Sequence, residues 1–88
     1  MTVLDPRDAE IVRLNRVDGE SVRKIGARLN IHASTVWRVV CAFRQELAVY
    51  IGDLDQHTPD TLRSITITIL DRAANVRAKA MPPLAKAA

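Results

Sequence analysis

The sequence predicts an all-α protein: a three-helix helix-turn-helix core with a long recognition helix, followed by a C-terminal amphipathic helix. Two observations carry this prediction. Apolar residues recur at spacings of three and four through most of the chain, which is the period of a helix with one buried face. Residues that favour helix starts precede these stretches, and Gly or Asn follows several of them. The 88 residues suit one small domain.

The first helix is expected to begin at Asp5, which can cap the helix, with Pro6 in the first helical position. Residues 1–4 form a short lead-in. The pair Asp18-Gly19 ends the helix. Its buried stripe should contain Ile11, Leu14 and Val17, with Val12 on the flank.

The segment 22–44 has the spacing of a helix-turn-helix, and the domain built around it should span residues 1–52. Ser21 caps a helix over 22–29, and Gly26 leaves room where the two helices cross. Asn30 stands at the turn, where its tolerance of a left-handed conformation is useful. The apolar positions of the motif are Ile25, Leu29, Ile31, Val36 and Val40.

The next helix has two different faces when its residues are spaced at about 100°. One face is a core stripe of Val36, Val39, Val40 and Phe43. The opposite face holds Ser34, Trp37, Arg38, Cys41 and Gln45. A solvated face would more often carry Glu and Lys than an exposed Trp, so this face favours contact with base edges in a major groove. The apolar pattern continues at Leu47, Tyr50 and Ile51 and ends at Gly52. We expect these residues to pack against the C-terminal segment or a second subunit.

Charge is segregated along the chain, although the net charge is only +3. No Asp or Glu occurs between Ser21 and Arg44. The basic residues of this stretch are Arg23, Lys24, Arg28, Arg38 and Arg44. We expect five uncompensated cations that form a local binding surface for phosphate.

Residues 23–40, RKIGARLNIHASTVWRVV, resemble the helix-turn-helix of the serine recombinases (resolvases and invertases) and of related homeodomain-like transposase and repressor domains. The resemblance implies DNA binding. The candidate base contacts are Ala33, Ser34 and Arg38. The candidate backbone contacts are His32, Thr35, Trp37, Arg23, Lys24, Arg28 and Arg44. Trp37 departs from the usual Tyr, and His32 stands where Ser usually caps the recognition helix.

Thr58 and Pro59 predict the start of another helix after a loop over 52–57. Residues 63–70, RSITITIL, alternate like a strand, but the cap before them and the helix-favouring residues after them predict a helix over 58–80. Its apolar face contains Leu62, Ile65, Ile69, Ala73 and Val76, and Ile67 does not fit that face. We expect this face to form a homodimer; the alternatives are a fourth helix folded back on the chain or a two-stranded ribbon. Residues 81–88 are expected to be disordered.

Features of other functional classes are missing from the sequence. The single cysteine, Cys41, and two separated histidines give no metal-ligand spacing, no catalytic constellation is evident, and we expect no enzyme activity, cofactor or small-molecule ligand. No apolar run approaches the length of a membrane span, and the N-terminus does not resemble a signal peptide. We therefore expect a cytoplasmic, nucleoid-associated protein of bacterial or phage origin.

The function predicted from these patterns is sequence-specific binding of double-stranded DNA by a dimeric transcriptional regulator. Repression at a palindromic operator, with the protein's own gene as one candidate target, follows from steric occlusion. Two other classes stay open. One is a DNA-handling component without regulatory output, such as a terminase small subunit, an excisionase-like factor or a recombinase accessory factor. The other is a protein-interaction module with a helix-turn-helix fold.

Overall fold

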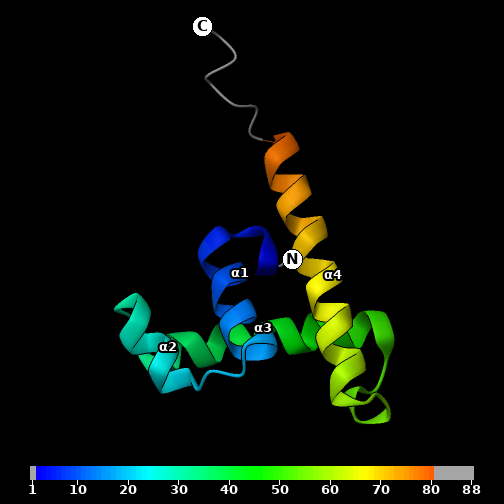
Figure 1. Ribbon diagram of the computed structural model, residues 1–88, viewed down its shortest axis with the longest axis horizontal. Helices are drawn as coiled ribbons and strands as arrows, with labels where there is room; N and C mark the ends of the chain where they lie inside the picture. The colour runs from blue at the N-terminus through cyan, green and yellow to red at the C-terminus, as the bar shows by residue number, and fades with distance from the viewer. Residues whose placement is uncertain (1, 81–88) are drawn as a thin grey trace, which may run out of the picture.

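The computed structural model describes residues 2–80, and every regular element in this range is helical. The main helices are α1 (Pro6–Val12), α2 (Val22–Leu29), α3 (Ala33–Ile51) and α4 (Pro59–Ala80). In Figure 1, α1 stands on α3, α2 packs near one end of α3, and α4 crosses the other end. The all-α helix-turn-helix prediction is confirmed. The disorder expected for residues 81–88 lies outside the described residues.

The start of α1 follows the predicted cap. The side chain of Asp5 accepts hydrogen bonds from the backbone N–H groups of Arg7 (2.9 Å) and Asp8 (3.1 Å). After Val12 the helix widens into a π turn, η2 (Arg13–Val17), which the sequence did not predict. Gly19 then leaves the helix with a φ of 76°, as expected for a residue that ends a helix.

The turn between α2 and α3 explains two residues of the motif. Ser21 accepts a hydrogen bond from the Lys24 N–H at 3.2 Å, and Asn30 is left-handed, with φ 57° and ψ 47°. A Cβ atom at Gly26 would lie 2.8 Å from the carbonyl oxygen of Ile31. Gly26 is therefore required by the backbone of the turn itself, more than by a contact between the two helix bodies.

One apolar core joins all four helices. Its most enclosed side chains are Val3, Ile11, Val12, Ile25, Val36, Phe43 and Leu47. The predicted stripe of α3 is confirmed, and Val17 of the first helix is only half-buried. At the end of α3, Leu47 is buried and Ile51 is half-buried against the core, whereas Tyr50 is 68% exposed and lines a groove with residues of α4.

The expectation that residues 1–4 are only a lead-in is wrong for the described part of that segment. Thr2–Leu4 form a 3-10 turn, η1, and Val3 is fully buried. The N–H of Thr2 donates to the Glu46 carboxylate of α3 at 2.7 Å, and the Arg77 guanidinium of α4 donates to the Val3 carbonyl. A small domain has little apolar surface to bury. Because Val3 packs between α3 and α4, it is a useful addition to the core.

The segment 63–70 is helical, so the strand alternative is wrong. Thr58 starts α4 by accepting a hydrogen bond from the Thr61 N–H at 3.2 Å. Thr66 and Thr68 donate their hydroxyl hydrogens to the carbonyl oxygens four residues earlier, at 2.7 and 3.1 Å. These bonds let the β-branched threonines reside in a helix. Ile67, the residue that fitted the helical face poorly, is 41% exposed.

The predicted apolar face of α4 packs largely on the chain's own core. Ala73 is buried, whereas Leu62, Ile65 and Ile69 are half-buried against the core cluster. Val76 is 52% exposed. Folding back on the same chain therefore occurs, and it leaves part of the face uncovered. Within residues 2–80, no helix has both the length and the apolarity needed to cross a membrane.

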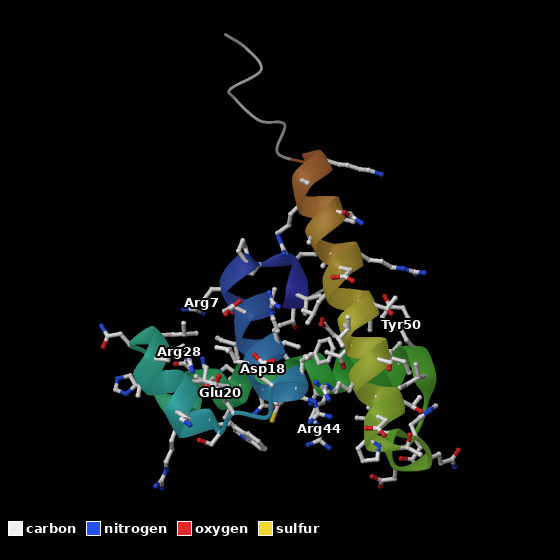
Figure 2. The ribbon with its side chains drawn as sticks, viewed as in Figure 1. Arg7, Asp18, Glu20, Arg28, Arg44 and Tyr50 are labelled. Carbon is white, nitrogen blue, oxygen red and sulfur yellow. The ribbon has the colours of Figure 1, made fainter. Side chains whose placement is uncertain are left out.

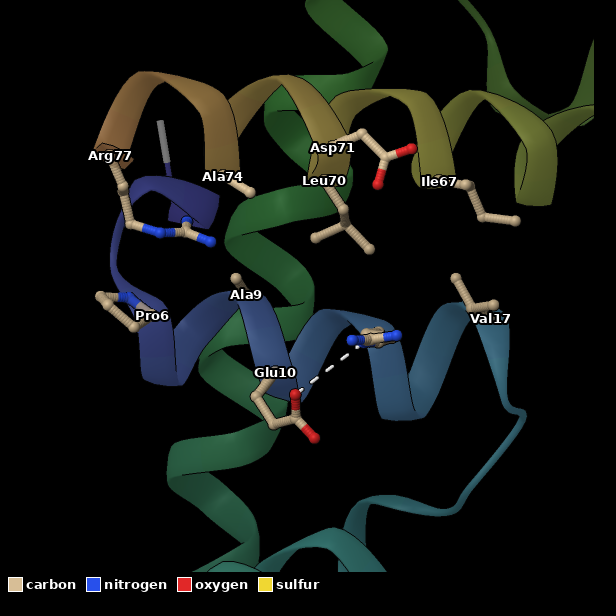
Figure 3. Close-up of a pocket in the computed structure, with 10 residues that line it drawn as sticks. Pro6, Ala9, Glu10, Val17, Ile67, Leu70, Asp71, Ala74 and Arg77 are labelled. Carbon is tan, nitrogen blue, oxygen red and sulfur yellow. Dashed lines mark ion pairs between the residues drawn. The ribbon is translucent and has the colours of Figure 1, made fainter. Parts of the chain in front are cut away.

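A cleft of about 200 Å³ separates α1 from α4 (Figure 3). Ala9 and Val17 line one side, and Ile67 and Leu70 line the other. Two of its charged groups already have protein partners: Arg13 lies 3.9 Å from Glu10, and Arg77 donates to the Val3 carbonyl. Because these charged groups are already paired, we interpret the cleft as space left between α1 and α4.

Candidate nucleic-acid interface

The outer face of α3 is polar over its first three turns. Ser34, Arg38 and Gln45 are exposed, and Trp37 is 53% exposed. Cys41 is half-buried between them along the helix. A large aromatic ring left in water beside an arginine is suited to a partner that offers both apolar and charged groups, such as the edge of a DNA groove.

The first residues of α3 differ in how far they reach into solvent. Ala33 and Thr35 are half-buried, so Ser34 is more accessible than either neighbour. His32 occupies the N-cap position but its side chain makes no capping hydrogen bond. The amide groups of the first turn therefore have no side-chain acceptor, and such groups favour an anion.

Arg28 corrects the prediction of five uncompensated cations. Its guanidinium lies 2.9 and 3.1 Å from the two carboxylate oxygens of Glu20, and Figure 2 shows these two side chains together. Glu20 stands just before the acid-free segment in sequence, and the turn between η2 and α2 brings it back to Arg28. A contact with both carboxylate oxygens offsets the charge of Arg28. Arg28 is therefore the least available of the predicted contacts to the DNA backbone.

The other predicted cations keep their charges free of ion pairs within residues 2–80. Arg23 and Lys24 are exposed at the start of α2. Arg38 and Arg44 are exposed on α3, and Arg44 lies beneath that helix in Figure 2. No carboxylate of the described residues forms an ion pair with any of the four. The positive charge therefore gathers on α3 and the start of α2.

Residues 9–47 match the family model of a homeodomain-like domain. The match covers the second half of α1, all of η2 and α2, and most of α3, and it ends before α4. No curated protein and no solved structure matched the chain. A homeodomain-like helix-turn-helix domain indicates DNA binding. The narrower likeness to serine recombinases remains a resemblance of residues 23–40.

Sequence reasoning missed Arg16, which lies in the π turn η2, within the residues that match the family model. Its side chain is half-buried and forms no hydrogen bond or ion pair with residues 2–80. Burial first, and the charge of Arg44 second, lower the pKa of Arg16. Arg16 precedes the acid-free segment, and the nearby Asp18 and Glu20 hid its charge in the sequence pattern.

Four of the five residues expected to dimerise line one side of an open apolar groove of about 550 Å³. Ile65, Ile69 and Val76 of α4 line it together with Tyr50, and Leu62 is not among its lining residues. The groove lies outside the part of the chain that matches the homeodomain-like family.

His57 has a backbone partner in the loop that follows α3. The His57 ring nitrogen Nε2 lies 3.2 Å from the Ile51 carbonyl oxygen, where it can hold the loop after α3. Among residues 2–80, no three His, Cys, Asp or Glu side chains gather as a metal site.

Proposed function

We propose that this chain is a sequence-specific regulator of transcription that binds double-stranded DNA as a homodimer and acts as a repressor. The observation that carries the proposal is the outer face of α3. Ser34 and Arg38 stand one turn apart and both reach solvent beside Trp37. An arginine can form two hydrogen bonds with the O6 and N7 atoms of guanine in the major groove, and a serine hydroxyl can bond to several bases.

The surroundings of this face suit the DNA backbone. Arg23 and Lys24 have no ion-pair partners in residues 2–80, and the start of α3 has no side-chain cap from His32. Thr35 and the Trp37 indole N–H provide further donors. Phosphate contacts of this kind hold a recognition helix in register while base contacts provide the specificity.

We propose a second copy of the chain as the occupant of the apolar groove. A single recognition helix reads few base pairs, and dimers of such domains read two half-sites about 34 Å apart. Leu4, Tyr50 and Val76 leave apolar surface exposed along the groove, as is typical of an interaction surface. A two-fold axis would set the groove of each copy against that of the other.

Repression follows from this mode of binding, since a bound dimer occludes a promoter without needing a catalytic or ligand-sensing group. We further propose that the operator is palindromic, that it lies upstream of the protein's own gene, and that the protein acts in the cytoplasm of a bacterium, encoded by a phage or mobile element. No enzyme activity is part of this proposal.

Selection from a pool of random DNA duplexes tests the function. The purified protein should enrich an inverted repeat whose half-sites lie about one helical turn, or a multiple of it, apart. Enrichment of a single short site would contradict the proposed dimer, and sequence-specific DNA binding would still stand. A pool that stays random although DNA is retained would favour a packaging or architectural role. No retention of DNA at low salt would favour a protein-interaction module.

A further inference from the structure

The short 3-10 turn η1 lies between the two helices that form the apolar groove. The groove is lined by Leu4 of η1, by Tyr50 and Ile51 at the end of α3, and by residues of α4. The backbone of α4 packs mainly against η1 and η2, and the backbone of α3 also packs against η1. Val3, the middle residue of η1, is fully buried. The shape of the groove therefore depends on η1 as well as on the two helices.

Hydrogen bonds tie η1 to each of these helices. The Glu46 carboxylate of α3 accepts hydrogen bonds from the Thr2 N–H at 2.7 and 2.9 Å, and from the Thr2 hydroxyl at 3.2 Å. The Arg77 guanidinium of α4 donates to the Val3 carbonyl, and Figure 3 shows this side chain reaching from α4 toward η1. Hydrogen bonds with one charged partner are about twice as strong as neutral ones. Two adjacent residues of η1 thus link α3 to α4.

The two charged side chains interact specifically with η1. Glu46 and Arg77 are both half-buried, and neither forms an ion pair within residues 2–80. Their side-chain hydrogen bonds in this range are those with Thr2 and Val3. A substitution of either charge should therefore loosen η1 without breaking another polar contact of the same side chain.

The polar groups of the groove suit a long partner surface better than a small ligand. Ser64, Thr68 and Arg72 follow one another at intervals of four residues, so they form one edge of α4. A small-molecule site would instead bring a few polar groups together at one point. Beside this edge, Ile65 and Ile69 line an apolar strip. An apolar strip with one polar edge fits the surface of another folded chain.

A second copy of this chain carries a side chain that complements the groove. Tyr50 stands at the groove and is 68% exposed. In a two-fold dimer, the Tyr50 ring of each copy can enter the groove of the other. The exposed Arg72 on the polar edge can then lie over that ring, since guanidinium groups are attracted to aromatic faces.

We propose that Glu46 and Arg77 are positioning residues for the homodimer: they hold η1 between α3 and α4 and so keep the groove in the shape that a second copy binds. This inference rests on the proposed function and extends it to two residues that do not line the groove. A molecule whose groove is not formed cannot bind a partner. The apparent affinity of the dimer therefore falls in proportion to the fraction of molecules with a formed groove.

The first experiment measures the dimer dissociation constant of Arg77→Met by sedimentation equilibrium. Methionine keeps an apolar stem and removes the donor to Val3. The constant should rise about tenfold, which corresponds to a formed groove in about one molecule in ten. Arg77→Lys retains a charged donor and should restore most of the affinity. Lys79→Met is the control, because it removes an exposed charge from the same end of α4, outside the groove lining, and should change nothing.

Glu46→Gln loosens η1 from the other side and supplies a second variant. Glutamine keeps an acceptor for Thr2 but loses the charge, so the dimer dissociation constant should also rise. In both variants, binding to a duplex with one half-site should be unchanged, because η1 and α4 lie outside the residues that match the homeodomain-like family. Amide hydrogen exchange should become faster in α4 and stay unchanged in α2.

Three outcomes would overturn the inference. An unchanged dimer dissociation constant in folded Arg77→Met and Glu46→Gln would do so and leave the proposed homodimer standing. Loss of half-site binding together with the dimer would show that these residues support the whole fold and do not position the groove. If the unchanged protein stayed monomeric at every concentration, the proposed homodimer would fail first, and this inference with it.

Discussion

The two halves of α3 share one buried stripe and differ on their outer surfaces. The first half, through Arg44, exposes Ser34, Trp37 and Arg38. The second half exposes Val49 and Tyr50, and Tyr50 lines the apolar groove beside α4. The inner stripe of Val36, Phe43 and Leu47 runs through both halves. The core therefore determines the fold, whereas the outer surface of each half determines what that half can contact. We propose DNA for the first half and a second copy of the chain for the other.

The largest expected effect tests whether the two halves share one core. Phe43 is 1% exposed, near the middle of α3. Phe43→Ala should lower the free energy of unfolding by about 3–5 kcal/mol. In chemical denaturation followed by circular dichroism and by Trp37 fluorescence, both signals should change in one transition. The exposed Gln45→Ala should change stability by less than about 0.5 kcal/mol. Two separate transitions would divide the helix into independent parts.

The next effect separates base reading from general attraction in the first half. Arg38→Ala should cost about 1–3 kcal/mol of binding free energy on the preferred duplex and leave binding to random DNA nearly unchanged. Arg23→Ala is the matched control, because removing a phosphate-binding charge should weaken both complexes alike. Equal reductions in affinity on both duplexes for Arg38→Ala would remove its role in reading bases.

The third prediction concerns dimer formation through the second half of α3 and α4. Val76 is half-exposed in the groove, so Val76→Asp should leave the fold intact and raise the dimer dissociation constant at least about tenfold, or 1.4 kcal/mol. Sedimentation equilibrium measures this constant. Val49→Asp alters an apolar residue that is 83% exposed and outside the groove lining, and it should leave the dimer unchanged. Equal behaviour of the two variants would place the interface elsewhere.

The smallest effect concerns Arg28. Because Glu20 neutralises it, Arg28→Ala should leave the salt dependence of DNA binding nearly unchanged. The ion pair that this variant removes is largely exposed, so its removal should cost less than about 1 kcal/mol of stability. A salt dependence that becomes shallower by about one would show that DNA displaces Glu20 and that the sequence-based assignment was right.

The parts of the fold that local signals define were predictable from the sequence. Caps at Asp5 and Ser21, the left-handed Asn30 and the spacing of Val36 and Phe43 all act within a few residues, and the structure follows them. The packing of Val3 between α3 and α4 depends on residues more than forty positions away, such as Glu46 and Arg77. A sequence pattern carries no such information.

The candidate site also combines features that local sequence defines with features that depend on distant residues. The polar outer face of α3 follows from helical periodicity and was predicted residue by residue. Which cations are free depends on where the chain turns, since Glu20 returns to Arg28. Counting acids within a sequence window did not find this contact, because charges pair through space.

The central claim is that the first half of α3 reads a DNA sequence. Its most direct test is fluorescence anisotropy over a series of salt concentrations, with DNA from upstream of the protein's own gene, the duplex enriched by selection, and scrambled versions of both. We expect the enriched duplex to bind at least about a thousandfold more tightly than its scrambled version. Tight binding to the upstream DNA would add autoregulation. Equal affinity for enriched and scrambled duplexes at every salt concentration would contradict the claim.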